Sequence, residues 1–251
     1  MRQHEKDDVL YYTFDLLDAH PELRHAVFGT KGPGGRPFNL SVNKGQREET
    51  EDNLRLAASI LGLPYPLYLM QAHGAGVLVL SDTKKNPTLE ELGDAKIGDA
   101  IIGGIGQSLL IKIADCQGII LYDPVTKALG LVHSGWRGST FNIIGRCVDA
   151  LVARKGVKPQ NILACVSPSL GPCCMEFKDW KDKLPEWAWA YRKENEHMDF
   201  WAMSVDQLKK AGVLEKNIEL SGVCTKCSEG FFSHRRGEDY RFGVMAGVLY
   251  V

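Results

Sequence analysis

The stretch "KALGLVHSGWRGST", residues 127–140, decides how this sequence is interpreted. A short apolar run ends at His133, and Gly135 and Gly138 flank a tryptophan and an arginine directly after it. Short apolar runs bounded by glycine are typical of buried strands, and glycine permits a tight turn. The stretch therefore predicts a strand that delivers an imidazole to a sharp turn, with an arginine close by.

The residues before this stretch predict a partner for its strand. "GIILYDPVTKALGLVHSG" (118–135) holds two apolar runs, and Asp123-Pro124 at the start of the segment between them favours a hairpin turn. Further short apolar runs predict more strands. They are residues 25–30, 66–74, 99–104, 108–116, 161–172 (leading into a loop) and 241–251.

Three other segments have the spacing of helices. In residues 46–64, acidic residues fill the start, apolar residues recur at helical spacing, and Gly62 with Pro64 ends the pattern. Residues 141–156 close on a glycine, and residues 186–212 form a helical region rich in tryptophan. Strands and helices alternate without a strict βαβ rhythm, which predicts a mixed sheet in an α/β or α+β domain.

Composition excludes several classes of protein. The 251 residues carry a formal net charge of −1, 44% are apolar and 24% are charged, unlike the basic footprint of a nucleic-acid binder. The charged start "MRQHEKDDVLYYTF" has no apolar signal core, and no apolar run is long enough for a membrane span. We therefore expect a cytoplasmic protein that binds neither nucleic acid nor membrane. Its seven cysteines are expected to be reduced thiols.

Three predicted strands end on residues that bind metals well. His73, Cys116 and His133 each follow an apolar run and lie beside a glycine turn. Two imidazoles and a thiolate suit Zn²⁺ or copper, and three protein ligands leave a fourth position open, as in catalytic zinc sites. Their spacing matches no local zinc-finger pattern. From spacing alone, a His or Cys at a strand end is more often a packed or hydrogen-bonded residue than a metal ligand.

Five motifs in order extend the picture. They are "QAHG", "ADCQGIILYDP", "VHSGWRG", "SPSLGPCCMEF" and "GVCT" followed by "EGFFSHRRG". Together, from about residue 27 onward, they resemble the YfiH family, known also as the multicopper polyphenol oxidoreductase (laccase) family, as peptidoglycan editing factors and as laccase-domain purine nucleoside phosphorylases. The resemblance implies a single YfiH-like domain over residues 1–251, with layered mixed sheets flanked by helices.

The resemblance also implies a site. Carried over motif by motif, His73, Cys116 and His133 are the metal ligands and part of the catalytic centre, with zinc as the cofactor and copper possible in the same place. Arg137 of "HSGWRG" is the fourth catalytic candidate, as an anion or substrate contact. A structural salt bridge or a cap on loop carbonyls is the alternative role for Arg137.

Substrate contacts follow from two further motifs. "TKGPGGRPFNLSVN" replaces the family's usual Arg-x-Gly-Gly loop, so that loop's contact is in doubt, but Asn39 of its Asn-Leu pair is retained as a substrate-binding candidate. Phosphate needs cations, and bidentate arginine suits it. The candidates are Arg137, Arg235 and Arg236, of which Arg235 is the chosen substrate-binding residue. His234 stands where the family commonly has tyrosine.

The function that the resemblance implies is a zinc-dependent purine nucleoside phosphorylase for adenosine, inosine and methylthioadenosine, with adenosine deaminase activity. Its partners are then a purine nucleoside and phosphate. Two alternatives stay open. The first is a hydrolase that edits peptidoglycan precursors, with Cys116 as a possible nucleophile paired with His133. The second is a copper-dependent polyphenol oxidase, which we disfavour because seven histidines are few for several copper sites.

Two groups of residues are less well explained. Asp115 is a candidate to orient a histidine, although a turn or cap acceptor is the favoured role. Cys173-Cys174 and Cys224-x-x-Cys227 suggest a four-thiolate zinc site. Because adjacent cysteines are awkward as two ligands of one tetrahedral ion, we do not expect a second metal there.

Overall fold

The predicted hairpin forms the centre of a six-stranded sheet in the computed structural model, which describes residues 1–250. Strand β7 (Gln117–Asp123) runs antiparallel to β8 (Ala128–Ser134), with Gly118 opposite His133. At the turn, the carboxylate of Asp123 accepts hydrogen bonds from the N–H of Val125 and the hydroxyl of Thr126, both at 2.9 Å. The turn chemistry therefore closes the hairpin and fixes its register.

The other strands of this sheet lie on both sides of the hairpin, in the order β10-β9-β7-β8-β5-β4. β7 pairs antiparallel with β9, and β8 pairs antiparallel with β5. The two outer strands, β10 and β4, pair in parallel with their neighbours, so the sheet is mixed. The bounds of these strands are β4 Val77–Val79, β5 Ala100–Gly103, β9 Leu163–Val166 and β10 Ile218–Leu220.

A second sheet has five strands in the order β1-β2-β3-β11-β6, all antiparallel. Its central strand β11 (Phe242–Val248) comes last in the sequence and pairs with β3 and β6. The remaining bounds are β1 Arg2–Lys6, β2 Val9–Thr13, β3 Leu23–Phe28 and β6 Ser108–Ile113.

The two sheets pack face to face through an apolar core that includes Ile111, Ile120 and Val244. They approach closely at Gly118 of β7, where an added Cβ would lie 2.6 Å from Cγ2 of Val244. Any side chain at position 118 would force the strands apart, and interiors at close-packed density leave no room for that. The sheets are therefore in tight contact directly beside His133.

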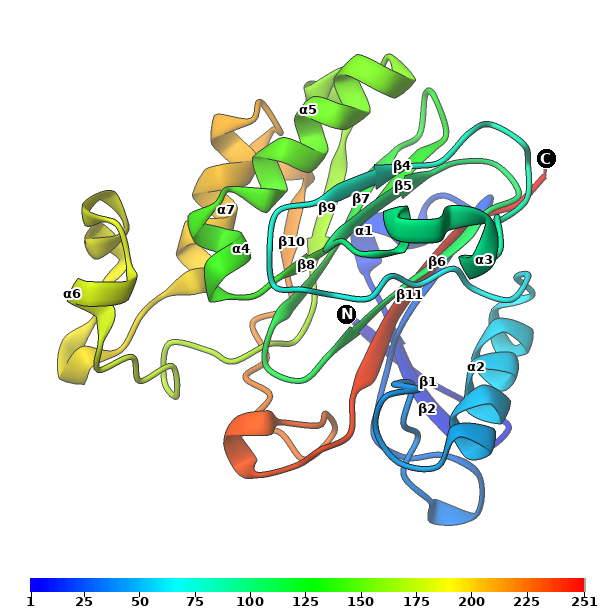
Figure 1. The fold of residues 1–251 in the computed structure, drawn as a ribbon, viewed down its shortest axis with the longest axis horizontal. Helices are drawn as coiled ribbons and strands as arrows, with labels where there is room; N and C mark the ends of the chain where they lie inside the picture. Colours follow the sequence, from blue (N-terminus) through cyan, green and yellow to red (C-terminus); the bar gives the residue numbers. More distant parts are fainter. Residues whose placement is uncertain (251) are drawn as a thin grey trace.

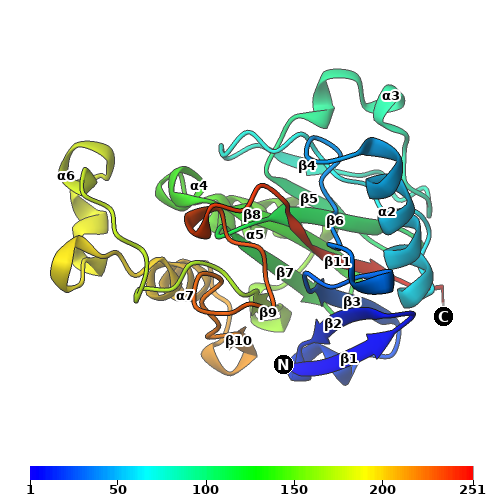
Figure 2. The ribbon, with the colours of Figure 1, turned by 90° about the horizontal axis from the view of Figure 1, so that it is seen from below.

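Helices cover the outer face of each sheet, which gives four layers (Figures 1 and 2). α2 (Arg47–Leu61) packs on the five-stranded sheet, where its Leu54 joins a core with Phe28 and Met245. α5 (Ile143–Lys155) and α7 (Phe200–Lys210) cover the six-stranded sheet. The short helices are α1 Asp15–Asp18, α3 Leu89–Leu92, α4 Trp136–Thr140 and α6 Trp180–Lys183.

Several short 3₁₀ helices connect these elements. They lie at Pro33–Gly35, Gly93–Lys96, Pro159–Asn161, Glu186–Tyr191, Glu194–Glu196, Glu215–Asn217 and His234–Arg236. Among residues 1–250, no helix has both the length and the apolar character that crossing a membrane requires.

Most predicted elements are confirmed, and two predictions need correction. The layered α/β arrangement, the hairpin, α2 ending at left-handed Gly62 and α5 ending at left-handed Gly156 agree with the sequence. Residues 66–74 are not a strand, because the segment changes partner: the N–H of Leu67 bonds to Ser108 and that of Met70 bonds to Lys96. Residues 186–212 contain α7, but their first part is 3₁₀ and irregular. The single-domain organisation stays a prediction.

His25 in β3 gives a test of this packing. It is buried, its Nε2 accepts the N–H of Phe14 at 2.8 Å, and burial lowers the pKa of His25 to about 4. Between pH 6.5 and 4 the unfolded chain binds more protons than the folded one, so the free energy of unfolding falls as pH falls through this window. Gln at position 25 keeps a hydrogen-bond acceptor but has no proton to gain in this pH range. The acid-induced fall in the free energy of unfolding should therefore be smaller in His25→Gln than in the wild type, by up to about 3 kcal/mol.

Chemical unfolding of both proteins at pH 7, 5.5 and 4.5 measures the difference. His234→Gln, at an exposed histidine, is the matched control and should follow the wild type. An acid slope that is the same in His25→Gln and the wild type would contradict the assignment.

Candidate functional site

His73, Cys116 and His133 come together although they lie far apart in sequence. His73 lies in the loop before β4, Cys116 between β6 and β7, and His133 near the end of β8. Their ligand atoms all lie within 4.8 Å of one another. The two imidazole rings are 4.7 Å apart between centroids and nearly perpendicular, at 84°. Each side chain therefore points to a common centre, as the motifs predict.

Asp99, directly before β5, holds two of these residues in place. Its buried carboxylate accepts a hydrogen bond from Nδ1 of His133 at 2.8 Å and from the N–H of His73 at 2.9 Å. It also accepts the N–H of Gly74 at 2.7 Å. Since an ionised carboxylate only accepts hydrogen bonds, Nδ1 of His133 must carry its proton. In the neutral form of His133, the lone pair is therefore on Nε2, which faces the centre and is available to a ligand.

The same carboxylate stabilises an unusual backbone conformation. His73 has a φ of 56°, in the left-handed region that residues other than glycine rarely adopt. The hydrogen bonds from the N–H groups of His73 and Gly74 to Asp99 fix this turn. The imidazole of His73 is therefore positioned by the main chain around it.

Charge pairing at the centre favours a thiolate. Although burial opposes both charges, the neighbouring Cys116 thiolate and Asp99 carboxylate raise the pKa of His133 to about 9. Burial also opposes ionisation of Cys116, yet His133 and His73 lower its pKa to about 6. A deprotonated thiol is the form of cysteine that binds metals and attacks electrophiles. The thiolate of Cys116 is therefore suited both to binding a metal ion and to attacking an electrophile.

Gly135 leaves the centre open. A Cβ at this position would lie 3.1 Å from both Sγ of Cys116 and Cδ2 of His73. Tetrahedral zinc with nitrogen and sulfur ligands needs donor atoms separated by about 3.5 Å. The donor set, whose atoms lie within 4.8 Å of one another, and the space beside Gly135 therefore fit a metal ion with three protein ligands.

The three side chains line a cavity of about 460 Å³. Its polar walls include Gln71, Lys112, Arg235 and Arg241, and its apolar walls include Trp136, Met175 and Phe200. The ammonium of Lys112 lies 4.3 Å from the ring centroid of Tyr68, and burial lowers the pKa of Lys112 to about 8. The cavity therefore combines cations for an anion with apolar surface for a flat group.

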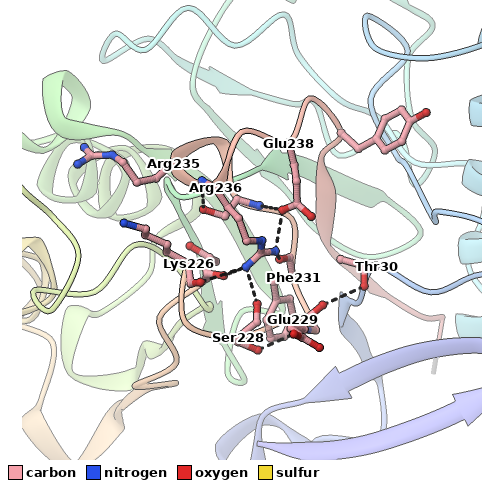
Figure 3. Close-up of polar contacts among 12 residues, drawn as sticks. Thr30, Lys226, Ser228, Glu229, Phe231, Arg235, Arg236 and Glu238 are labelled. Atoms are coloured by element: carbon pink, nitrogen blue, oxygen red, sulfur yellow. Dashed lines mark hydrogen bonds and ion pairs between the residues drawn. The ribbon is translucent and has the colours of Figure 1, made fainter.

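Arg235 and Arg236 are consecutive but differ in what they do. The guanidinium of Arg236 donates to the carbonyls of Thr225, Lys226, Ser228 and Phe231 and pairs with Glu238 (Figure 3). Because these acceptors occupy the guanidinium of Arg236, this side chain holds the surrounding loop together. Arg235 points away from this cage in Figure 3 and lines the cavity.

Asp115 anchors the same loop. Its carboxylate accepts the hydroxyls of Thr225 at 2.6 Å and Ser233 at 2.7 Å, and the N–H of Arg235 at 2.6 Å. It therefore acts as a turn acceptor, the role that the sequence favours, and Asp99 orients the histidine instead.

The structure does not bring Arg137 or Asn39 into this cavity. Arg137 is exposed, its guanidinium carbon lies 5.0 Å from the centroid of the Trp136 ring, and it lies outside the cavity lining. Asn39 is buried, and its amide bonds to the loop at Ser41 and Lys44 and to Thr50. Ser41 lines the cavity, so Asn39 supports the cavity-lining loop through hydrogen bonds without lining the cavity itself. The catalytic and substrate-binding roles of these residues stay predictions.

A second thiol cluster also forms. The ligand atoms of Cys173, Cys174, Cys224 and Cys227 lie within 4.8 Å of one another, a grouping able to bind a metal ion. Adjacency does not keep the two sulfurs out of one cluster, because those of Cys173 and Cys174 lie 3.8 Å and 3.4 Å from that of Cys227. Both sulfurs therefore lie close to Cys227 on the other loop.

Four residues of the site were not identified from the sequence. Asp99 carries a weak signal, since "IGDAIIGG" places a carboxylate directly before a buried strand. Lys112 interrupts the apolar strand "SLLIKI", which is a second weak signal. Trp136 was noted only as part of its motif, and nothing local distinguishes Arg241.

Comparisons with known proteins agree with this architecture. The model of the family described as "Multi-copper polyphenol oxidoreductase laccase" matches residues 27–251, so the chain belongs to this family. The purine nucleoside phosphorylase YlmD of Geobacillus stearothermophilus is 29% identical over 225 residues, covering 82% of this chain and 81% of the relative. The crystal structure of YlmD from the same organism aligns with a TM-score of 0.82 and 25% identity, over 99% of this chain and 98% of that one.

A human relative extends the comparison. The purine nucleoside phosphorylase LACC1 is 26% identical over 84% of this chain, and the chain spans 50% of that relative's length. The relatives that the chain resembles are thus enzymes, named for phosphorolysis of purine nucleosides. The predicted family and fold are confirmed.

Asp99→Asn tests what holds the site together. Removing the charge leaves Nδ1 of His133 and the His73 turn without a full acceptor set, and should lower the free energy of unfolding by about 3 kcal/mol. Urea unfolding of the metal-free protein measures this. Asp94→Asn, at an exposed position nearby, is the matched control and should behave as the wild type. Equal stability of the two variants would exclude a central role for Asp99.

Proposed function

We propose that this protein is a zinc-dependent purine nucleoside phosphorylase that acts on adenosine, inosine and methylthioadenosine, and that it also deaminates adenosine. The observation that carries the proposal is one cavity in which Lys112, Arg235 and Arg241 lie with apolar side chains beside the His73–Cys116–His133 centre. The names of the relatives supply the reaction class.

Phosphorolysis requires phosphate to attack C1′ of the ribose while the bond from C1′ to the purine nitrogen breaks. Lys112, Arg235 and Arg241 provide positive charge at the cavity for the phosphate. Arginine suits a tetrahedral anion because its fork donates two parallel hydrogen bonds. Positioning two substrates in one cavity lowers the barrier by converting a bimolecular encounter into an ordered one.

The apolar walls of the cavity are the proposed binding surface for the purine ring. Trp136 and Phe200 line the cavity together with Met175, and aromatic faces stack on flat heterocycles. Trp136 is held edge-to-face by Phe177, with ring centroids 5.4 Å apart, and Phe177 in turn contacts Phe200. This aromatic row fixes the wall against which a purine would lie.

His73, Cys116 and His133 would hold zinc, and copper fits the same donors. The ion would supply Lewis acidity toward a substrate or phosphate oxygen. The chain itself fixes the ligands: Asp99 selects the tautomer of His133, and Gly135 keeps the centre free of side chains. A thiol whose pKa is already low needs little free energy to lose its proton to a ligand bond.

One observation favours a second function. Cys116, His133 and Asp99 follow one another as nucleophile, base and orienting carboxylate, the order found in cysteine hydrolases. This arrangement supports an amidase that edits peptidoglycan precursors. Metal content separates the two functions, because a metal-bound thiolate is a poor nucleophile.

Metal analysis combined with adenosine turnover tests the proposal. The protein, purified without a metal-binding tag, should release adenine from adenosine only when phosphate is present. His133→Ala should abolish this release and the zinc bound at the centre, because it removes both a ligand and the partner of Asp99. His234→Ala, a histidine at the rim of the same cavity, is the control for loss of an imidazole and should retain the zinc.

Bound zinc without any change in adenosine or inosine would exclude the nucleoside assignment. A peptidoglycan precursor is the next substrate to test in that case. Activity in metal-free protein that alkylation of Cys116 abolishes would favour the hydrolase.

Lys112 predicts the pH dependence of phosphate use. Because burial lowers the pKa of Lys112 to about 8, its charge is present below pH 8 and lost above it. The kcat/KM for phosphate, which reports free-enzyme pKa values, should therefore fall as pH rises through 8. Lys112→Met should lower kcat/KM at pH 7 and remove that part of the profile. Lys44→Met, at an exposed lysine outside the cavity, is the control.

A further inference from the structure

The four-cysteine cluster lies apart from the His73–Cys116–His133 centre and needs its own explanation. Cys173 and Cys174 lie in the loop after β9, and Cys224 and Cys227 lie in the loop after β10. The sulfur of Cys227 is 3.4 Å from that of Cys174 and 3.8 Å from that of Cys173. All four thiols are free.

These separations distinguish a possible metal site from a disulfide. A disulfide would place two sulfurs about 2.05 Å apart. A zinc ion with four thiolates at about 2.3 Å places neighbouring sulfurs about 3.8 Å apart, at the edges of a tetrahedron. The two distances to Cys227 lie near the tetrahedral value and far from the covalent one, and all four sulfurs lie within 4.8 Å of one another, so the cluster fits a four-thiolate site.

Backbone hydrogen bonds build this arrangement from both loops. The N–H groups of Cys227 and Ser228 bond to the carbonyl of Cys224, at 3.2 Å and 3.0 Å, which turns both sulfurs of this pair to one side. The N–H of Cys174 bonds in a similar turn to Gly171 at 2.9 Å. The two loops are joined next to the thiols, where the N–H of Thr225 bonds to Ser169 at 3.0 Å.

We propose that Cys173, Cys174, Cys224 and Cys227 bind one zinc ion as a closed structural site, separate from the three-ligand centre. Four thiolates select a soft or borderline cation, and a full tetrahedral set leaves no open position for substrate. The ion contributes no step to the reaction. It joins two loops that are about fifty residues apart in sequence and that carry little secondary structure, and closing such a long loop restricts the unfolded chain.

The joined loops also hold Arg235 at the cavity. The guanidinium of Arg235 donates to the carbonyls of Cys174 at 3.4 Å and Glu176 at 3.1 Å. The cage of Arg236 is built from the other loop, with the carbonyls of Thr225 and Lys226 at 2.8 Å and 3.2 Å (Figure 3). Arg235 is therefore braced by both zinc-binding loops, and the ion positions it. This last consequence rests on the proposed function, since it assigns phosphate to Arg235.

Metal counting tests the site without any reference to activity. Elemental analysis of untagged protein should find two zinc ions per chain in the wild type, one in Cys227→Ser and one in His133→Ala. Lys226→Ala, between the two cysteines of the same turn, is the matched control and should retain two. Zinc content in Cys227→Ser equal to that of the wild type would overturn the proposal, as would a wild type whose metal is lost entirely in His133→Ala.

Cobalt gives a second measurement in case Cys227→Ser does not fold. Metal-free His133→Ala, reconstituted with Co²⁺, should show the intense visible absorption of tetrahedral cobalt and a strong sulfur-to-cobalt charge-transfer band. Weak octahedral absorption without the charge-transfer band would overturn the proposal. A disulfide between these cysteines would also contradict it. The intact mass of the metal-free wild type would then be lower by the hydrogen atoms lost on oxidation, and would stay lower under mild reductant.

Kinetics then separate the two proposals. If Arg235 binds phosphate, Cys227→Ser should raise the KM for phosphate several-fold with little change in the zinc of the three-ligand centre. If the wild type holds two zinc ions but does not phosphorolyse nucleosides, the structural site stands and the proposed function fails.

Discussion

The site depends on the hydrogen bonds that the buried carboxylate of Asp99 accepts. It accepts the ring N–H of His133 from one strand and main-chain N–H groups of the His73 turn from a loop. A buried ionised group is stable only when hydrogen bonds replace its water, and each of these donors would in turn be costly to leave unpaired. One side chain thus fixes a tautomer, a left-handed backbone conformation and the distance between two imidazoles.

Local signals explain which parts of the fold the sequence could predict. The hairpin is set by Asp123 and its turn partners, and α2 by apolar spacing and Gly62, all within a few residues of one another. The conformation of residues 66–74 could not be predicted in this way, because it depends on pairing with Ser108 and Lys96, which are distant in sequence. The motifs placed the three central residues correctly as neighbours, but Asp99 could not be found because its role exists only after β5 and β8 pair.

The same distinction applies to the charged residues. Arg235 and Arg236 are chemically identical neighbours. The guanidinium of Arg236 is enclosed by four carbonyls and Glu238, whereas that of Arg235 donates to only two carbonyls, and Arg235 lines the cavity. Arg137, which follows His133 closely in sequence, is the second residue of α4 and lies outside the cavity lining, although its neighbour Trp136 is part of it. For Cys173 and Cys174, adjacency in sequence argued against a shared metal site. The long-range contact between their loop and the loop of Cys224 and Cys227 brings all four sulfurs together nevertheless.

The order of the strands has a consequence for how the protein matures. Cys116 lies where the chain passes from β6 in one sheet to β7 in the other, so the centre is complete only when both sheets have docked. The five-stranded sheet in turn needs β11 at its middle, and β11 follows every other strand in the chain. During synthesis the ligands therefore emerge long before they can converge. An ion held by these three residues would therefore bind at the last stage of folding, when long-range pairing is finished.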